Sequence, residues 1–196
     1  MPRLPPPDAD LIERREILDA GGITRTLRRM ASELVERGGA QGAEGEGAPY
    51  LVGIRTGGAY LAARLVDMMR GYDDSVRAVL GAIDISLYRD DVFRGLPKPE
   101  IGPTDLPESL DGRVVVLVDD VLFTGRTIRA AMDVLADYGR PRKVALAVLV
   151  DRGLRELPIQ PDFVGVEVQT TAAESVRVML KERGEPDRVV LRERRS

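Results

Sequence analysis

The thirteen residues from Val115 to Thr127, VVLVDDVLFTGRT, are the part of this chain best suited to do chemistry. Four apolar residues precede the adjacent carboxylates Asp119 and Asp120, so we expect these at the carboxyl end of a strand, where open α/β sheets bind ligands. Residues 124–127 add two hydroxyls, a glycine and consecutive backbone N–H groups at a predicted helix start, which suits an anion. Carboxylates suit vicinal hydroxyls and Mg²⁺, and the N–H groups suit a monophosphate. The pattern therefore predicts a site for a phosphorylated ribose.

The same residues have a simpler interpretation as a turn followed by a capped helix. Asp120 or Thr124 would then be the N-cap residue, because short polar side chains accept hydrogen bonds from the first N–H groups of a helix. A lone Asp-Asp pair would favour this interpretation. The complete thirteen-residue pattern favours the ligand site.

Composition limits the kind of protein that carries this site. The chain has 196 residues, of which 43% are hydrophobic and 31% charged, and this suits one globular α/β domain. Cysteine and histidine are absent, which excludes disulfides, thiolate nucleophiles, catalytic triads and imidazole-bound metals. The formal net charge of -3 gives no overall attraction to nucleic acid or membranes. No apolar run reaches transmembrane length, so we expect a cytoplasmic protein without a membrane partner.

Strands and helices are expected to alternate along the chain. Short apolar runs predict strands over residues 50–54, 76–87, 114–118 and 143–150. Periodic segments predict helices over residues 23–37, from the loop after 54 to 69, and over 126–138. Residues 119–125 are expected to form the turn before the last of these helices. This alternation predicts a doubly wound, mostly parallel sheet with flanking helices. Alternating apolar residues between 176 and 191 favour a C-terminal hairpin over a helix.

Three stretches lie outside these elements. Residues 1–19 are a proline-rich, polar N-terminal extension, and residues 38–49 read as a glycine-rich surface loop, with a linker to a second domain as the weaker alternative. Residues 88–112 contain four prolines and no sustained period. Because long loops in compact domains are often functional, we expect a lid over the site, with a loop of no function as the alternative.

The motif VVLVDDVLFTGRT resembles the motif with which type I phosphoribosyltransferases bind 5-phosphoribosyl 1-pyrophosphate (PRPP). Its second part, DDVLFTGRT, is similar to that of the bifunctional family that combines uracil phosphoribosyltransferase activity with regulation of pyrimidine operons. The resemblance extends from Ile23 over most of the chain, through LVGIRTGG, IDISLYRDD and GRPRKVALAVLVDRGLRELPIQPDFVG. It implies a single phosphoribosyltransferase domain over residues 1–196 with the type I fold, a flexible lid and a small C-terminal β hairpin or hood.

The resemblance also implies a role for each part of the site. Asp119 and Asp120 would bind the ribose hydroxyls, with Mg²⁺ carried by PRPP nearby. The 5-phosphate would be held by Val121, Leu122, Phe123, Thr124, Gly125, Arg126 and Thr127. Pyrophosphate would be bound by Arg55, Thr56, Gly57 and Gly58. The lid would include Tyr88, Arg89, Asp90 and Asp91. The base would lie near Val150, Asp151 and Arg152.

This assignment suits the chemistry of phosphoribosyl transfer. Positive charge develops on the ribose as pyrophosphate leaves, so the protein must neutralise the leaving group, orient the ribose and exclude water. Mg²⁺, Arg55 and a catalytic Arg89 from the lid can neutralise it, and none of these needs a histidine. The alternatives are that Arg89 lies on a solvated loop and that Arg55 caps a turn.

The chain departs from the family pattern at four positions. Gly58 stands where the pattern has arginine, which predicts weaker catalysis. A histidine, an arginine and a lysine that the family associates with RNA recognition are replaced by Leu154, Gln160 and Val166. Each replacement removes a phosphate-directed donor, so we expect weaker RNA binding than in relatives. The basic residues that remain as an RNA patch are Arg25, Arg28, Arg29 and Arg155, and a solvated helix face with one surface arginine explains them equally well.

Three functions are compatible with these residues. The favoured one is an enzyme that makes UMP and pyrophosphate from uracil and PRPP, and that regulates pyrimidine genes through nucleotide-modulated binding to an mRNA leader. The second is a nucleotide-sensing RNA-binding regulator whose catalysis has decayed. The third is a phosphoribosyltransferase for another base, hypoxanthine or guanine. The resemblance further implies a homo-oligomer, a dimer or larger.

Overall fold

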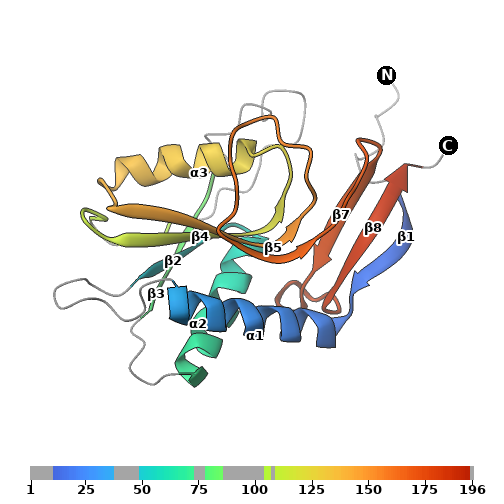
Figure 1. The fold of residues 1–196 in the computed structure, drawn as a ribbon, viewed down its shortest axis with the longest axis horizontal. Coiled ribbons are helices and arrows are strands. Elements are labelled where there is room, and N and C mark those ends of the chain that lie inside the picture. Colours follow the sequence, from blue (N-terminus) through green and yellow to red (C-terminus); the bar gives the residue numbers. More distant parts are fainter. Residues whose placement is uncertain (1–10, 38–48, 73–77, 86–103, 107–108, 195–196) are drawn as a thin grey trace.

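A computed structural model describes residues 11–37, 49–72, 78–85, 104–106 and 109–194. Its centre is a five-stranded parallel sheet with the strand order β3-β2-β4-β5-β6 (Figure 1). The strands are β2 (Tyr50–Ile54), β3 (Val79–Ile83), β4 (Val114–Leu122), β5 (Lys143–Asp151) and β6 (Phe163–Glu167). The predicted mostly parallel, doubly wound sheet is confirmed. β6 was not predicted, because its five residues follow a proline-containing loop without a long apolar run.

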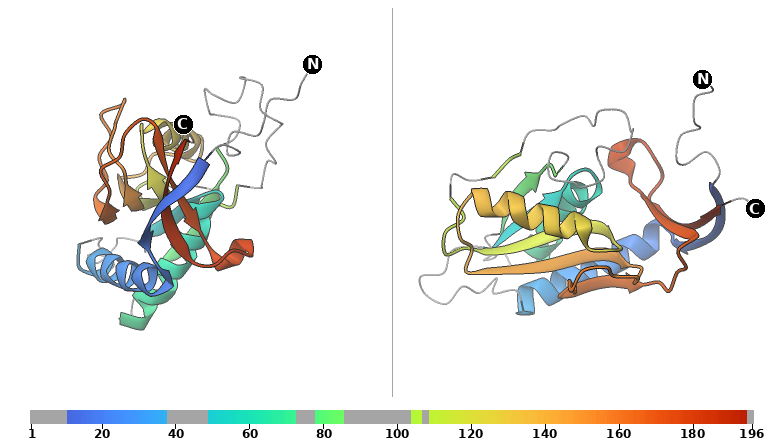
Figure 2. Two further views of the ribbon diagram at one scale, coloured as in Figure 1. Left: turned by 90° about the vertical axis from the view of Figure 1, so that its right-hand side faces the viewer. Right: turned by 90° about the horizontal axis from the view of Figure 1, so that it is seen from above.

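Helices cover both faces of this sheet. α1 (Ala20–Arg37) and α2 (Gly57–Tyr72) lie on one face and α3 (Arg126–Asp137) on the other (Figures 1 and 2). In β4, Val116 and Val118 pack in the layer of α1 and α2, whereas Val115 and Leu117 pack in the layer of α3. Successive side chains of a strand point to opposite faces, so this central strand is buried on both sides. That double burial explains its uninterrupted apolar run.

The strand β4 continues four residues beyond its predicted end at Val118. Val121 and Leu122 pair with Val150 and Asp151 of β5, so the sheet extends past the two aspartates. The segment predicted as a turn is therefore strand for more than half its length, and the turn itself is limited to residues 123–125. The reason is that cross-strand pairing continues wherever the neighbouring strand offers partners, and adjacent carboxylates do not end it.

A second, antiparallel sheet has the order β1-β8-β7 and stands beside one end of the parallel sheet (Figures 1 and 2). It consists of β1 (Leu11–Leu18), β7 (Glu174–Met179) and β8 (Arg188–Arg194), and the 3₁₀ helix η1 (Lys181–Arg183) joins the last two. We call this sheet together with η1 the hood. The predicted C-terminal hairpin is confirmed. The strand β1 corrects the description of residues 1–19 as a polar extension, and it was missed because its exposed, charged centre shows no apolar alternation.

A network of ion pairs fastens the hood to α2. Arg64 on α2 donates to the two carboxylate oxygens of Glu182 at 2.8 and 2.6 Å and to both of those of Asp187 at 2.8 Å. Asp187 Oδ1 also accepts the backbone N–H of Lys181 at 2.7 Å. Burial opposes the charge of Arg64, but these hydrogen bonds outweigh it and raise the pKa of Arg64. Arg64 in turn lowers the pKa of both carboxyls.

Several predictions concern residues that the structure does not describe. The lid residues Tyr88, Arg89, Asp90 and Asp91, most of the loop over 38–49 and the first ten residues lie outside the described ranges. Within the described ranges, no helix is both long enough and apolar enough to cross a bilayer.

Candidate functional site

The two adjacent carboxyls lie near the carboxyl end of β4, as predicted, but within the strand. Asp119 is 6% exposed, and its Oδ1 accepts the backbone N–H of Asp120 at 3.0 Å. Asp120 leaves the other face of the strand and meets the start of α2, where a Cβ built on Gly57 would lie 2.2 Å from Asp120 Oδ2. Burial raises the pKa of Asp120, opposed by backbone N–H hydrogen bonds and by the charge of Arg183. A cation bound nearby would therefore stabilise the ionised form of Asp120.

The loop between β4 and α3 forms a cavity of about 310 Å³. Its lining is Val121, Leu122, Phe123, Thr124, Gly125, Arg126, Thr127 and Glu156, which includes every residue predicted to bind the 5-phosphate. Gly125 is the N-cap of α3 with a φ of 91°, and a glycine has no side chain with which to cap the helix. Neither Asp120 nor Thr124 is therefore the N-cap residue, but Thr124 Oγ1 accepts the N–H of Arg126 at 3.5 Å, so Thr124 takes part in the capping that the alternative interpretation predicted. The first N–H groups of a helix lack partners within it and attract phosphate.

Glu156 is a member of this cavity that the sequence did not reveal. Its Oε2 accepts from Arg126 at 2.8 Å from Nε and 2.7 Å from Nη2. The backbone N–H groups of Glu156 and Leu157 donate to Thr124 O at 3.0 and 3.2 Å. The segment after β5 therefore supports the phosphate loop. Arg126 lines the cavity with its backbone, because Glu156 binds the Arg126 guanidinium.

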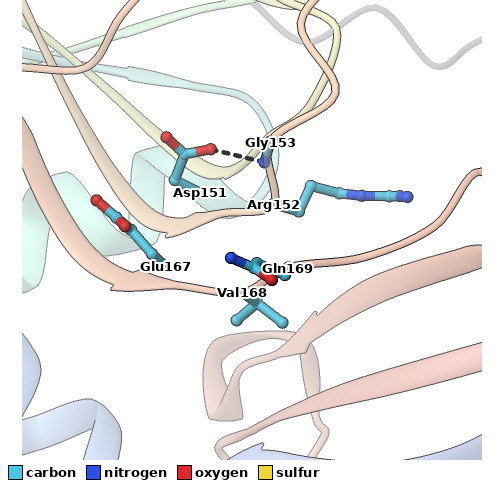
Figure 3. Close-up of a pocket in the computed structure, with 6 residues that line it drawn as sticks. All are labelled: Asp151, Arg152, Gly153, Glu167, Val168 and Gln169. Carbon is cyan, nitrogen blue, oxygen red and sulfur yellow. Dashed lines mark hydrogen bonds between the residues drawn. The ribbon is translucent and has the colours of Figure 1, made fainter.

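A second cavity of about 220 Å³ lies at the ends of β5 and β6 (Figure 3). Its lining residues are Asp151, Arg152, Gly153, Glu167, Val168 and Gln169. Two of the three residues predicted near the base, Asp151 and Arg152, are among them. The third, Val150, is fully buried in the core cluster and does not line the cavity, because its side chain points into the layer of α1 and α2.

The side chain of Arg152 points away from this cavity and is 6% exposed (Figure 3). Its guanidinium stacks on the ring of Phe123 at 4.0 Å from the centroid. It donates to Thr170 Oγ1 at 3.1 Å and to the carbonyl oxygens of Thr171 and Glu174 at 3.2 and 2.8 Å. Burial lowers the pKa of Arg152. Arg152 thus ties the loop before β7 to the phosphate loop.

Arg155 does not belong to an exposed RNA patch. Its side chain is 13% exposed and forms an ion pair with Asp151 at 2.5 Å. It also donates to the carbonyl oxygens of Phe123 at 2.9 Å, Gly153 at 3.1 Å and Ile159 at 3.1 Å. All of these acceptors are backbone or buried groups of the site itself. Arg155 therefore stabilises the loops around both cavities.

The other three predicted patch residues lie on α1. Arg29 donates to Glu33 at 2.6 Å and to the carbonyl oxygens of Val164 and Gly165 at 2.8 and 2.6 Å, so it joins α1 to β6. Arg25 and Arg28 are exposed. Arg29 is exposed as well, so all three of these residues remain in the predicted patch, with Arg29 also bound to Glu33 and β6.

The predicted pyrophosphate loop connects β2 with α2. The N–H of Arg55 donates to Ile83 O at 2.9 Å, whereas its side-chain Nε is buried and has no partner within the described part of the chain. A Cβ on Gly58 would lie 2.2 Å from Val118 O and 3.1 Å from the Cα of Asp119, both backbone atoms. The backbone of β4 therefore leaves no room for a side chain at position 58 of this chain. A Cβ on Gly57 would also meet Asp120, at 2.2 Å from its Oδ2 and 3.0 Å from its Cβ.

This difference between neighbouring glycines predicts different responses to a methyl group. Gly58→Ala is expected to lose about 1–3 kcal/mol of stability, because overpacking against backbone cannot be relieved by a side-chain rotation. Gly57→Ala should lose less than half as much, since Asp120 can turn away. Thermal unfolding of both variants beside the parent checks this. Equal melting temperatures for the two variants would contradict this difference between side-chain and backbone contacts.

The chain is similar in sequence to proteins of a known family. The phosphoribosyl transferase domain family matches residues 13–183. The bifunctional protein PyrR of Geobacter sulfurreducens is 50% identical over 175 residues, which cover 89% of this chain and 96% of the relative. The bifunctional protein pyrR of Enterococcus faecalis is 46% identical over 178 residues, covering 91% of this chain and 96% of the relative.

Solved structures show the same fold at low identity. The Leishmania tarentolae HGPRT-ase in complex with GMP has a TM-score of 0.67 and 14% identity, with 91% of this chain and 96% of that chain covered. The Trypanosoma cruzi hypoxanthine phosphoribosyltransferase has a TM-score of 0.66 and 17% identity, with 94% and 98% covered. The resemblance that the DDVLFTGRT motif indicated is thereby confirmed along nearly the whole chain. The chain belongs to the phosphoribosyl transferase domain family and, within it, to the bifunctional PyrR proteins.

Proposed function

We propose that this protein transfers the phosphoribosyl group of PRPP to uracil, releasing pyrophosphate and UMP, and that it regulates pyrimidine genes by nucleotide-modulated binding to an mRNA leader. The observation that carries the proposal is the start of α3 at Gly125, which lines a cavity together with the residues that directly follow Asp119 and Asp120 in the chain. The name of the relatives, bifunctional protein PyrR, supports two activities in one chain. We further propose that the protein acts in the cytoplasm as a homo-oligomer.

Each part of PRPP has a matching part of the site. The N–H groups at residues 124–127 would hold the 5-phosphate at a helix N-terminus. The carboxyls of Asp119 and Asp120 would accept hydrogen bonds from the two ribose hydroxyls, which orients the ring for attack at its anomeric carbon. The unpartnered buried Nε of Arg55 would donate to the pyrophosphate and stabilise the charge that develops as it leaves.

Mg²⁺ is expected to accompany PRPP, and the residues present fit such an ion. Mg²⁺ is usually bound by one or two carboxylates together with substrate phosphates rather than by a cage of protein ligands. Asp119 and Asp120 provide carboxylate oxygens, and the described residues contain no cluster of three or more acidic ligands. When bound, the ion would neutralise charge on the diphosphate. Asp120, whose pKa burial raises, would gain a counter-charge.

The second cavity is proposed to take the base. Its volume of about 220 Å³ and its polar lining by Asp151, Glu167 and Gln169 suit a small heterocycle with both carbonyl and N–H groups. Asp151 is held in place by the N–H of Gly153 at 2.9 Å and by Arg155 at 2.5 Å, so the lining is arranged before the base arrives. Hypoxanthine or guanine remains the second candidate, since solved structures with the same fold carry those names.

Binding to RNA is expected to be weaker than in relatives. Leu154 is 45% exposed and Gln160 is exposed, so both stand at the surface without the cationic groups of the family pattern. Arg155, the nearest arginine in sequence, is held by Asp151 and by carbonyl oxygens. Fewer cations means fewer counterions released from RNA, and hence lower affinity with a shallower salt dependence.

One experiment tests both activities on the same sample. Turnover of PRPP and Mg²⁺ with uracil, hypoxanthine and guanine is expected to favour uracil by at least about tenfold, or roughly 1.4 kcal/mol. UMP should change the affinity for a pyrimidine-leader RNA titrated at several salt concentrations. Turnover of a purine base alone would identify the second candidate. RNA binding without turnover of any base would show a regulator with decayed catalysis.

A further inference from the structure

One stretch of chain, residues 151–156, takes part in both cavities. Asp151, Arg152 and Gly153 line the second cavity, and Glu156 lines the cavity of the phosphate loop. Three successive carbonyl groups of the phosphate loop accept hydrogen bonds from this stretch: Arg152 N donates to Leu122 O at 3.1 Å, Arg155 Nη1 to Phe123 O at 2.9 Å and Glu156 N to Thr124 O at 3.0 Å. The backbones of the two cavities are therefore directly bonded to each other.

The guanidinium of Arg155 binds residues of both cavities at once. Its Nη2 donates to Asp151 Oδ2 at 2.5 Å, and its Nη1 donates to Phe123 O at 2.9 Å and to Gly153 O at 3.1 Å. Its Nε donates to Ile159 O at 3.1 Å. The side chain is largely buried, and the planar group fixes the directions of all these bonds together. A displacement of Phe123 O therefore reorients the group that holds Asp151.

Phe123 is held from the same stretch through its ring as well. The guanidinium of Arg152 lies 4.0 Å from the ring centroid. Phe123 directly precedes residues 124–127, whose N–H groups are proposed to hold the 5-phosphate. An anion that fixes these N–H groups also restrains Phe123 O and, through it, the guanidinium of Arg155. Asp151, which that guanidinium binds, is then restrained in the second cavity.

We propose that Arg155 is a positioning residue that couples the two cavities, so that an anion at the phosphate loop raises the affinity of the second cavity for the base. The inference rests on the proposed placement of the 5-phosphate and the base. Because linkage is reciprocal, the base must raise the affinity for the anion by the same factor. Arg155 acts on the ligands through Asp151 and Phe123.

The test uses uridine and inorganic phosphate, which together contain the base, ribose and phosphate of UMP but lack the activation needed to join. Calorimetry measures the affinity for uridine with and without saturating phosphate, and the affinity for phosphate with and without uridine. In the parent, each ligand is expected to strengthen binding of the other at least about fivefold. In Arg155→Met this factor should fall below about twofold, because Asp151 and Phe123 O lose their shared donor.

Two further variants separate this coupling from charge and from stability. Arg155→Lys keeps a cation beside Asp151, but an ammonium group cannot replace the planar fork that also binds Phe123 O. It should keep the affinity for uridine alone within about threefold of the parent and lose the coupling. Arg64→Met is the matched control, because the Arg64 side chain is 14% exposed, against 13% for Arg155, and binds carboxylates of the hood. It should lower the melting temperature and keep the coupling of the parent.

Each contrary result has a distinct meaning. A parent whose affinity for uridine does not change with phosphate would overturn the inference. Full coupling in Arg155→Met or in Arg155→Lys would overturn it too, since the bonds to Phe123 O would then not be the link. An equal loss of coupling in Arg64→Met would assign the effect to stability, which also contradicts it. A parent that couples the two probes through Arg155 but does not turn over PRPP with uracil would refute the proposed enzymatic function and leave the inference standing.

Discussion

Replacing Asp120 with asparagine is expected to lower the rate of phosphoribosyl transfer at least about tenfold and, at the same time, to stabilise the protein without substrate. The first effect follows because an amide cannot provide the charge that pairs with Mg²⁺-PRPP. The second follows because burial raises the pKa of Asp120, so the folded state resists the charge that this group carries at neutral pH. A residue that costs stability and supports turnover is typical of an active site.

The raised pKa of Asp120 determines how its effect on stability changes with pH. Because the pKa of Asp120 is higher in the folded state, the folded protein binds the proton more tightly than the unfolded chain does. The stability gained from this proton is complete below the ordinary pKa of 3.8 and is lost as the pH rises through the raised value. Asp120→Asn should therefore be more stable than the parent at neutral pH and should lose that advantage near pH 4.

Thermal unfolding between pH 4 and pH 8, beside kcat/KM for PRPP, measures both effects. Asp133→Asn is a matched control, because it removes the same charge from a half-exposed pair with Arg129 at 3.2 Å on the outside of α3. The control should change neither turnover nor the pH dependence of stability. An Asp120→Asn protein with full activity would remove this carboxyl from the site.

Replacing Arg64 with methionine is expected to lower stability by about 2 kcal/mol, between the values typical of exposed and of buried ion pairs. For a protein of this length that corresponds to a fall of roughly 4–8 °C in melting temperature. The cause is that Glu182 and Asp187, whose side chains are 27% and 13% exposed, lose their shared cation and stay partly buried.

The effect of Arg64 should depend on pH in the opposite sense to that of Asp120. Arg64 lowers the pKa of Glu182 and Asp187, so its stabilising effect is present above their ordinary values of 4.5 and 3.8 and is lost as the pH falls through the lowered values. Arg70→Met on the same helix is the control, because Arg70 forms a longer ion pair of 3.8 Å, and its partner Asp67 is exposed. If both variants unfold at the same temperature at neutral pH, the network does not hold the hood.

The sequence predicted the parallel sheet and its phosphate loop because their information is local. An apolar run followed by carboxylates, a glycine and hydroxyls identifies a strand, a loop and a helix start within thirteen residues. The same local signal misplaced the end of β4, since the pairing of Val121 and Leu122 depends on β5, more than twenty residues away. Local polarity indicates where a strand could end, and the neighbouring strand decides where it does.

Charged residues were the least predictable part of the site. Arg155 was predicted on an RNA-binding surface and instead lies inside, bonded to Asp151 and to backbone oxygens. Arg64 and Glu182 were not singled out at all, because 118 positions separate them and nothing in either neighbourhood indicates the other. The type of a charged residue states what it can bind, whereas its partner depends on the completed fold.

The pairing of β1 with β8 limits the order in which the two sheets can form during synthesis. In the hood, the first described strand of the chain lies against the last, with Leu11 opposite Arg194. All five strands of the parallel sheet leave the ribosome before β8, so this sheet can assemble while β1 is still unpaired. Until β8 has been synthesised, β1 is an unpaired strand. Because its centre is charged rather than apolar, it is protected from aggregation during this time. The hood can therefore close only after the whole parallel sheet has been synthesised, and the ribosome makes the phosphate loop before it makes the charged residues of η1.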